Sequence, residues 1–387
     1  MRVKTARWNN ATSQKEWRER GRGTLIVGGT GTPDPEPPVG EVLFPGHIPN
    51  RVLVGMASPD DSTNFDPGWT EALSLIGAPI YEARRFVSGW ITNANFNSMM
   101  AEATQADAYP VISFKVPGNN WAGVTSGSYN ADLTNLYNYA VTRRTSGPGG
   151  TAQPFACSFH HEPAGDGDLS TWAAMQEYCT WFFAGRRGGT AGSSYNAAHD
   201  VSDIVSWAPV GNGFWWRTST TGGTDGNNAF PQSLINALKQ NHGIILNDFY
   251  DCDYVNQQAA LTDASFRTPG SGVRTHKRIE NFMVWARARN SGAVGCGEFG
   301  VIDGAEMDRC FDVMFKNRDL WAIANYFNSG VNSDHEWRLI PSNYPAGNPT
   351  GSKGLVDFGG NAQSQARLDR FKVGLAASIS AQNTGPL

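Results

Sequence analysis

The sequence predicts an α/β fold, a (β/α)8 TIM barrel that follows a short basic N-terminal tether. Two observations favour this fold: eight short apolar runs alternate with longer helical patterns, and 387 residues leave room for a barrel of about 250 residues with insertions. Charged residues make up 17% and hydrophobic residues 40% of the chain, which indicates a folded core rather than a disordered chain.

The eight apolar runs are short and rich in β-forming residues. Each is nearly continuous in apolar character, as expected for strands that a parallel sheet buries on both faces. In chain order they are RVLVGMA from Arg51, EARRFVSGW from Glu82, YPVISFKV from Tyr109, PFACSFHHEP from Pro154, DIVSWAPVG from Asp203, GIILNDFYD from Gly243, GAVGCGEFG from Gly292 and LWAIANYFN from Leu320.

Amphipathic stretches between the runs predict helices. They are LTNLYNYAVTRR, LSTWAAMQEYCTWFFAGRR, PQSLINALKQN, RIENFMVWARARN and EMDRCFDVMFKN, and NAQSQARLDRFKVGLAASI closes the series. Repeated alternation of strand and helix favours an α/β fold, and eight units favour closure into a barrel over an open doubly wound sheet.

The chain divides into three regions by composition. Residues 1–27 form a basic docking segment, since the first 23 residues hold seven Lys or Arg and two Glu, a net charge of +5. The whole chain carries −4, so the remainder carries −9. Residues 28–42 are rich in Gly and Pro and are expected to be a linker. Residues 43–387 are expected to form the barrel domain.

Several classes of function are disfavoured by the sequence. The net charge of −4 gives no sign of nucleic-acid binding, no apolar stretch reaches the length of a membrane span, and the N-terminus has no apolar core of a secretory signal peptide. Five Cys without a CxxC pair do not predict zinc or a disulfide framework, and the His residues lack metal-ligand spacing. We therefore expect no metal and no cofactor.

Two glutamates follow apolar runs at the place where barrel enzymes carry their chemistry. Active sites of (β/α)8 barrels lie at the carboxyl ends of the strands. The fourth run ends in FHHEP with Glu162, and the seventh ends in GEFG with Glu298. Glycosidic bond cleavage needs two carboxyl groups, one to protonate the leaving oxygen and one to attack the anomeric carbon. The alternative is that each Glu is structural and paired with Arg84 or Arg85.

FHHEP and GEFG resemble the two catalytic motifs of the clan A glycoside hydrolases. FHHEP is most similar to the motif of family 26, the β-mannanase-like enzymes, and the likeness extends in layout over residues 45–385. The resemblance implies a retaining reaction with Glu162 as general acid/base and Glu298 as nucleophile. Residues 163–166 differ from the family's pattern, so the resemblance predicts the chemistry and not a mannan substrate.

The resemblance also implies substrate-binding positions. His160 and His161 precede the acid/base, and Tyr250 in NDFYD stands where the family keeps a tyrosine that is hydrogen-bonded to the nucleophile. Arg84 or Arg85 would keep Glu298 ionised. The aromatic residues that we expect to stack on sugar rings, in and before the loop GNGFWWR, are Trp207, Trp215 and Trp216.

Asp251 and Asp253 form a further acidic pair beside Tyr250. They are expected either to bind a cation or substrate, or to stay solvated at a loop.

The basic segment, the linker and the missing signal peptide together are similar to bacteriophage minor tail proteins that display a hydrolase domain. This layout implies a location on a virion tail, or otherwise outside the cell. The partners would be a cell-envelope or other polysaccharide and, through residues 1–27, other tail proteins. Three alternatives remain open: a free enzyme with a disordered tail, a non-catalytic barrel that binds glycan as a structural tail protein, and a different hydrolase on the same barrel.

Overall fold

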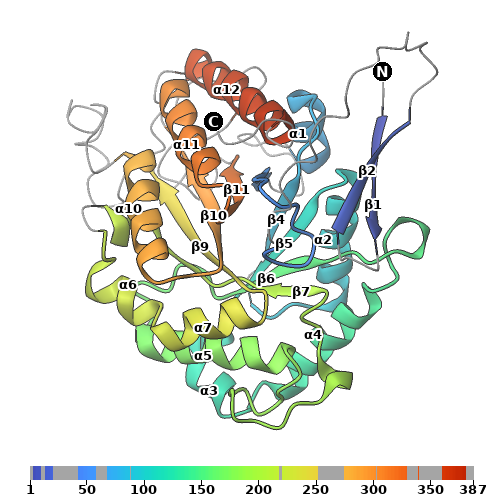
Figure 1. Ribbon diagram of the computed structural model, residues 1–387, viewed down its shortest axis with the longest axis vertical. Coiled ribbons are helices and arrows are strands. Elements are labelled where there is room, and N and C mark those ends of the chain that lie inside the picture. The colour runs from blue at the N-terminus through green and yellow to red at the C-terminus, as the bar shows by residue number, and fades with distance from the viewer. Residues whose placement is uncertain are drawn as a thin grey trace, which may run out of the picture.

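The computed structural model of the chain describes residues 3–9, 14–20, 42–57, 68–87, 89–217, 220–251, 274–301, 303–328, 339 and 360–380. These residues form one two-stranded antiparallel sheet and one parallel sheet of nine short strands. Helices surround the parallel strands on the outside (Figure 1).

The parallel sheet has the strand order β7-β6-β5-β4-β3-β11-β10-β9-β8. Its strands are β3 (Leu53–Ala57), β4 (Glu82–Val87), β5 (Tyr109–Phe114), β6 (Phe155–Phe159), β7 (Val205–Trp207), β8 (Val210–Asn212), β9 (Ile244–Tyr250), β10 (Ala293–Gly300) and β11 (Trp321–Phe327). The first and last of these, β3 and β11, pair with each other, as the two ends of a barrel wall must.

The two strands at the ends of this order are halves of one interrupted strand. β7 pairs with β6 and β8 pairs with β9, and only Ala208 and Pro209 separate the halves. The Ala208 amide donates to Cys157 on the β6 side at 2.8 Å, while the Pro209 carbonyl accepts from Leu246 on the β9 side at 3.0 Å. The wall therefore closes at this seam, and the fold is a (β/α)8 TIM barrel with nine short strands in eight positions.

The described helices connect the strands. They are α1 (Trp69–Ile76), α2 (Asn93–Gln105), α3 (Trp121–Thr125), α4 (Asn130–Thr142), α5 (Leu169–Phe183), α6 (Gly223–Ala229), α7 (Gln232–Gln240), α10 (Thr275–Ala288), α11 (Gly304–Lys316) and α12 (Gly360–Ser380). Short 3-10 turns lie between them, at Pro117–Asn119, Pro148–Gly150, Ala197–His199 and Gly213–Trp216.

The structure confirms the predicted fold class, and each of the eight apolar runs contains a strand. All six helical stretches that the sequence predicted are helical as well. Helices α1, α2, α3 and α6 were not predicted. Asn and Ser make up much of the first half of α2, and such residues favour caps over helix interiors. Helix α2 nevertheless buries Phe96, Met99, Met100 and Ala103, which recur at helical spacing.

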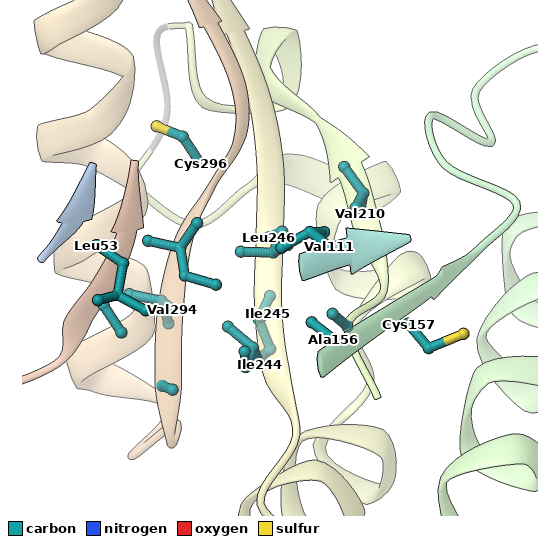
Figure 2. Close-up of a cluster of buried hydrophobic side chains, with 14 of the residues drawn as sticks. Leu53, Val111, Ala156, Cys157, Val210, Ile244, Ile245, Leu246, Val294 and Cys296 are labelled. Carbon is teal, nitrogen blue, oxygen red and sulfur yellow. The ribbon is translucent and has the colours of Figure 1, made fainter. Parts of the chain in front are cut away.

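The core fills the space between strands and helices. Strands β3, β5, β6 and β10 are buried at every residue, which explains their continuous apolar character. Figure 2 shows part of this core, with side chains such as Leu53, Val111, Val210 and Leu246 from different strands. Cys157, Cys179, Cys296 and Cys310 are buried as free thiols, where a reduced Cys packs as a small apolar residue.

Polar side chains cross the barrel interior between strands that are not neighbours. Asn325 on β11 donates to Glu82 on β4 at 3.2 Å, and Tyr109 on β5 donates to Ser206 on β7 at 3.3 Å. In each pair, one strand lies between the two partners. These contacts identify the inward face of β4, β5, β7 and β11, which the sequence alone left open.

The basic N-terminal region contains a hairpin of β1 (Val3–Asn9) and β2 (Gln14–Arg20). Its antiparallel register pairs Arg7 with Glu16 and Lys4 with Glu19. The docking role of residues 1–27 stays a prediction, and residues 21–41, with most of the expected linker, lie outside the described residues. In the described part of the chain, we find no helix with the length and hydropathy of a membrane span.

We expect Gly55→Ala to destabilise the barrel. A Cβ on Gly55 would lie 1.9 Å from the carbonyl oxygen of Glu82, so β3 and β4 would have to move apart. Urea unfolding should show a loss of about 2 kcal/mol or more. Gly192→Ala is the matched control, because nothing lies within 4 Å of its added Cβ. Equal unfolding midpoints for the two variants would contradict this packing.

Candidate active site

A buried arginine from β4 lies at the centre of the candidate site. Nη1 of Arg84 is 3.1 Å from Oδ1 of Asp248 on β9 and 3.5 Å from Oε1 of Glu298 on β10. Its Nε donates to Oγ of Ser113 on β5 at 3.0 Å. Strands β3 and β11 lie between β4 and β10, so Arg84 crosses the barrel interior to reach both carboxylates.

A β-bulge places Glu298 opposite Asp248. The pairing of β10 with β9 runs from Cys296 opposite Asn247 to Glu298 opposite Asp248, and Gly297 is the extra residue. A Cβ on Gly297 would lie 2.5 Å from Oδ1 of Asp248 and 2.7 Å from Nη1 of Arg84. Glycine is therefore required directly before Glu298, because the ion pair occupies the space that any side chain would take.

Tyr250 at the end of β9 completes the surroundings of Glu298. Its hydroxyl donates to Oε2 of Glu298, while Arg84 contacts the other oxygen. The two oxygens of Glu298 thus face a hydroxyl donor and a cation, and the residue is 6% exposed. The two contacts together fix the orientation of the carboxyl group.

Glu162 projects from a turn in the left-handed region of backbone space. Its φ is 52°, and that of His160 is 57°. Such values cost a non-glycine residue about 1–2 kcal/mol and persist only where the surroundings enforce them. The Glu162 amide donates to the carbonyl of Val210 on β8 at 3.0 Å, which ties the turn to the barrel wall.

The carboxyl of Glu162 is in a different environment from that of Glu298. Within the described part of the chain, no ion pair or side-chain hydrogen bond reaches it. Burial raises the pKa of Glu162 to about 7, and the negative charge of Glu298 adds to this, while Arg84 and Lys115 oppose it. Glu162 is therefore protonated in a large fraction of molecules near neutral pH, as a general acid must be.

The two histidines before Glu162 lie on different sides of the turn. His161 is half-buried, with its ring 5.4 Å from that of Phe86. Burial, with Arg84 and Lys115 adding to it, holds the pKa of His161 well below its usual range, so the ring is neutral at neutral pH. His160 is fully buried and its Nε2 contacts Asp166 at 2.9 Å, so its expected role in substrate contact is wrong.

Arg85 lies on the opposite face of β4 from Arg84. Its Nη1 pairs with Glu102 of α2 at 2.8 Å, outside the barrel wall. Successive residues of a strand point to opposite faces, so only one of the two arginines can reach the barrel interior. The expectation that Arg85 binds substrate or orients Glu298 is therefore wrong, and Arg84 has that position.

The predicted sugar-stacking tryptophans are packed in the core. Trp207 donates its indole N–H to Gln176 at 2.8 Å and stacks on Phe183. Trp216 is fully buried and donates to Asn247 at 2.9 Å. Trp215 is 6% exposed, beside Phe230. The expectation for these three residues is wrong because their rings already pack on protein. Phe214, between Gly213 and Trp215, is 46% exposed instead.

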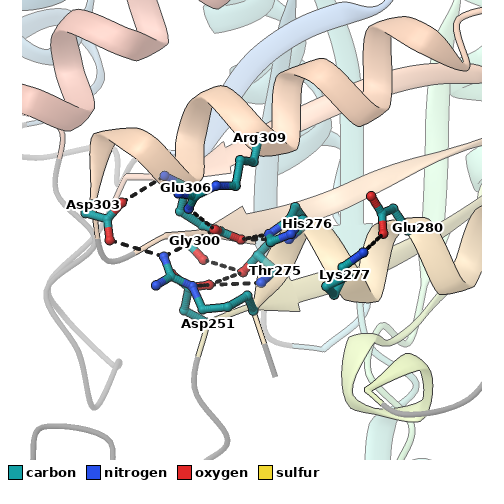
Figure 3. Close-up of polar contacts among 10 residues, drawn as sticks. Asp251, Thr275, His276, Lys277, Glu280, Gly300, Asp303, Glu306 and Arg309 are labelled. Carbon is teal, nitrogen blue, oxygen red and sulfur yellow. Dashed lines mark hydrogen bonds and ion pairs between the residues drawn. The ribbon is translucent and has the colours of Figure 1, made fainter. Parts of the chain in front are cut away.

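Asp251 belongs to a buried structural network rather than to a solvated loop. It accepts from the amide of Thr275 at 2.9 Å and contacts Nε of Arg274 at 3.3 Å. Arg274 also pairs with Asp303 and Glu306, so the network joins the end of β9 to the starts of α10 and α11 (Figure 3). Asp253 lies outside the described residues.

Several residues of the site were not predicted from the sequence. Asp248 stands two positions before Tyr250 on β9, so strand periodicity places both on the same face, and this signal was available. Ser113 had no feature in the sequence that would have placed it in the site. Phe86 and Phe327 are half-buried at the ends of β4 and β11, where Phe86 contacts His161 and Phe327 contacts Tyr250 at 6.0 Å between ring centroids.

No protein-family model and no curated protein matches the sequence. Solved structures with a similar fold include glycoside hydrolases. Thermotoga maritima Cel5A, solved with mannotriose, is 10% identical over 83% of this chain and 98% of its own, with a TM-score of 0.46. A Bacteroides ovatus GH5 xyloglucanase is 11% identical over 84% and 75% of the two chains, with a TM-score of 0.44.

The Podospora anserina GH26-CBM35 β-(1,4)-mannanase is another similar structure. It is 12% identical over 75% of this chain and 59% of its own, with a TM-score of 0.36. Such values indicate a distant likeness, and the side chains of this chain carry the functional conclusion.

Glu162→Gln should stabilise the protein at high pH. A carboxyl whose folded pKa is raised contributes stability below its unfolded value, near 4.3, and loses it as pH rises through about 7. Glutamine does not titrate, so above pH 7 the variant should gain at most about 3 kcal/mol over wild type, since Glu162 keeps some solvent contact. Below pH 4 the gain should vanish.

Chemical unfolding above pH 7 and below pH 4 measures the difference in free energy of unfolding between the variant and wild type. Glu177→Gln on α5 is the control for loss of a carboxyl outside the site. A gain that is equal at both pH values would contradict the assignment.

Proposed function

We propose that this chain is a retaining glycoside hydrolase that cleaves a polysaccharide. The observation that carries the proposal is the unequal environment of two carboxyl groups at the barrel mouth. Glu298 lies between the Arg84 guanidinium and the Tyr250 hydroxyl, whereas burial raises the pKa of Glu162 to about 7. One group is arranged as a carboxylate and the other as an acid, which is the division of roles that glycoside hydrolysis needs.

The first step forms a covalent intermediate. An oxygen of Glu298 attacks the anomeric carbon while the bond to the leaving oxygen breaks, and Glu162 gives its proton to that oxygen. Glu298 is then an ester and Glu162 a carboxylate, so the net charge of the pair is unchanged. Arg84 and Tyr250 orient the nucleophile throughout.

The second step reverses the roles. Glu162 takes a proton from water, and the water oxygen attacks the anomeric carbon as the ester bond to Glu298 breaks. Two displacements on the same carbon return the product with its original anomeric configuration. Phe86 and Phe327, half-buried beside His161 and Tyr250, are two aromatic side chains available for contact with a sugar ring.

A mechanism-based label separates the two glutamates. Dinitrophenyl 2-deoxy-2-fluoro glycosides of glucose, mannose, galactose and xylose should form a stable ester on Glu298, seen by intact-protein mass and peptide mapping. Glu298→Gln should not be labelled and should lose turnover by at least about 10⁴-fold. Glu162→Gln is the matched control and should still be labelled, because dinitrophenolate leaves without acid assistance.

Product stereochemistry tests the mechanism independently. Proton NMR of the first product should show the anomer of the substrate, and the opposite anomer would disprove a retaining reaction.

The second candidate is a non-catalytic barrel that binds glycan. A strained turn and a raised pKa at Glu162 are costs that binding alone does not require. Absence of new reducing ends from a panel of envelope and plant polysaccharides, together with absence of labelling, would favour that candidate.

We also propose that residues 1–27 dock the barrel to a phage tail and that residues 28–42 link the two. The net charge of +5 in the first 23 residues and the Gly- and Pro-rich run support this layout. A chain lacking residues 1–41 should keep its kcat on glycan and fail to enter phage particles, as followed by immunoblotting of purified virions. Full incorporation of the shortened chain would disprove the docking role.

A further inference from the structure

The turn that carries Glu162 is held to the strands on both sides of it. Toward β5, the His160 amide donates to the carbonyl of Phe114 at 2.7 Å. Toward β8, the Glu162 amide donates to Val210 at 3.0 Å, and the Ala164 amide donates to Oδ1 of Asn212 at 3.0 Å. The backbone of the turn is therefore fixed at its two ends, yet two of its residues are in the left-handed region.

Asp166 closes this turn from its far side. Its Oδ2 accepts from Nε2 of the fully buried His160 at 2.9 Å, and Nζ of Lys115 lies 3.8 Å from the same oxygen. Its carbonyl accepts from Nδ2 of Asn119 at 3.1 Å. His160 is in turn packed edge-on against Trp121, and its carbonyl accepts from the indole of Trp172 at 2.8 Å.

We propose that Asp166 is a positioning residue for Glu162. Asp166 acts through His160 and Lys115 to hold the strained turn in place. This inference rests on the proposed function, because positioning matters only if Glu162 transfers a proton. Asp166 is half-exposed and lies on the loop, so it does not belong to the barrel core. Its side chain contacts Lys115, which follows β5, and His160, which follows β6.

The same side chains act on Glu162 through their charge. Lys115 lowers the pKa of Glu162 and Asp166 raises it, in addition to the larger effects of burial, Glu298 and Arg84. Glu162 also interacts with charged or titratable groups on its neighbouring elements, namely Asp248 and Tyr250 on β9. Asp166 and Lys115 are thus a pair of opposite charges with opposite effects on one carboxyl.

Two substitutions at Asp166 separate geometry from charge. Asp166→Asn keeps an oxygen that accepts from His160 and removes the charge, whereas Asp166→Ala removes both. We expect Asp166→Ala to lower kcat on the order of 10-fold to 100-fold with KM changed less than about 2-fold, because the acid is misplaced rather than the substrate. Asp166→Asn should restore most of that kcat.

The pH profile tests the charge. The alkaline midpoint of kcat/KM reports the general acid in the free enzyme. It should move down by roughly half a pH unit in Asp166→Asn and up by a similar amount in Lys115→Met. A merely structural role would lower activity at every pH without moving the midpoint in opposite directions. Asp312→Ala is the matched control, since Asp312 pairs with Lys316 at 2.7 Å on the surface of α11.

The outcomes separate this inference from the proposed function. The Glu162 midpoint can be followed without substrate, by NMR of protein with carbon-13 at the glutamate carboxyls, with the signal assigned by its loss in Glu162→Gln. If wild type turns over no glycan and the two midpoints still move oppositely, the function fails and the action of Asp166 and Lys115 on Glu162 stands. The inference would be overturned if the Glu162 midpoint did not move in Asp166→Asn and Lys115→Met, or if Asp166→Ala kept the wild-type kcat.

Discussion

The guanidinium of Arg84 is the group on which the candidate site depends. Its Nη1 lies between Asp248 and Glu298, and the residue is fully buried. A buried cation is costly without anions, and buried carboxylates are costly without a cation, so the three groups hold one another inside the barrel. Burial raises the pKa of Asp248, with Glu298 and Glu162 adding to it, and Arg84 opposes this shift. Gly297 has no side chain, and this leaves the space that Arg84 and Asp248 occupy.

The same arrangement makes the two glutamates unequal. Glu298 is part of a rigid wall, on a buried strand with donors at both oxygens. Glu162 lies after its strand, on a turn whose conformation is unfavourable for its own backbone. Under the proposed function, a place within the strand suits Glu298 because a nucleophile must be held in one orientation, and the turn suits Glu162 because burial there raises its pKa. The roles proposed for the two groups thus match their different places, one within a strand and one on a turn after a strand.

Much of the fold could be predicted from the sequence, because strands buried on both faces leave continuous apolar runs. The same property hides the direction of each side chain. Arg84 and Arg85 are adjacent in a strand whose first four residues are all buried, so composition could not tell which of them faces the interior. The tryptophans were misassigned for a related reason: a large aromatic ring beside a barrel end packs equally well on helices.

Within the site, the FHHEP and GEFG motifs indicated Glu162 and Glu298. Asp248 belongs to neither motif, and its ion pair is with Arg84, 164 positions away in the chain. Asp166 was visible only as a departure from a family pattern. Long-range pairing of this kind exists only once the barrel is closed.

The seam in the barrel wall has a mechanical consequence. Ala208 and Pro209 divide the wall so that β7 belongs to the β6 side and β8 to the β9 side. Glu162 follows β6, yet its amide and that of Ala164 are bonded to β8. Glu162 is therefore bonded to the same ladder of paired strands, β8 to β9 to β10, that carries Glu298. The same turn is also bonded to Phe114 of β5 through the His160 amide, so it bridges the two sides of the seam, and a separation of β7 from β8 would strain the turn that carries Glu162.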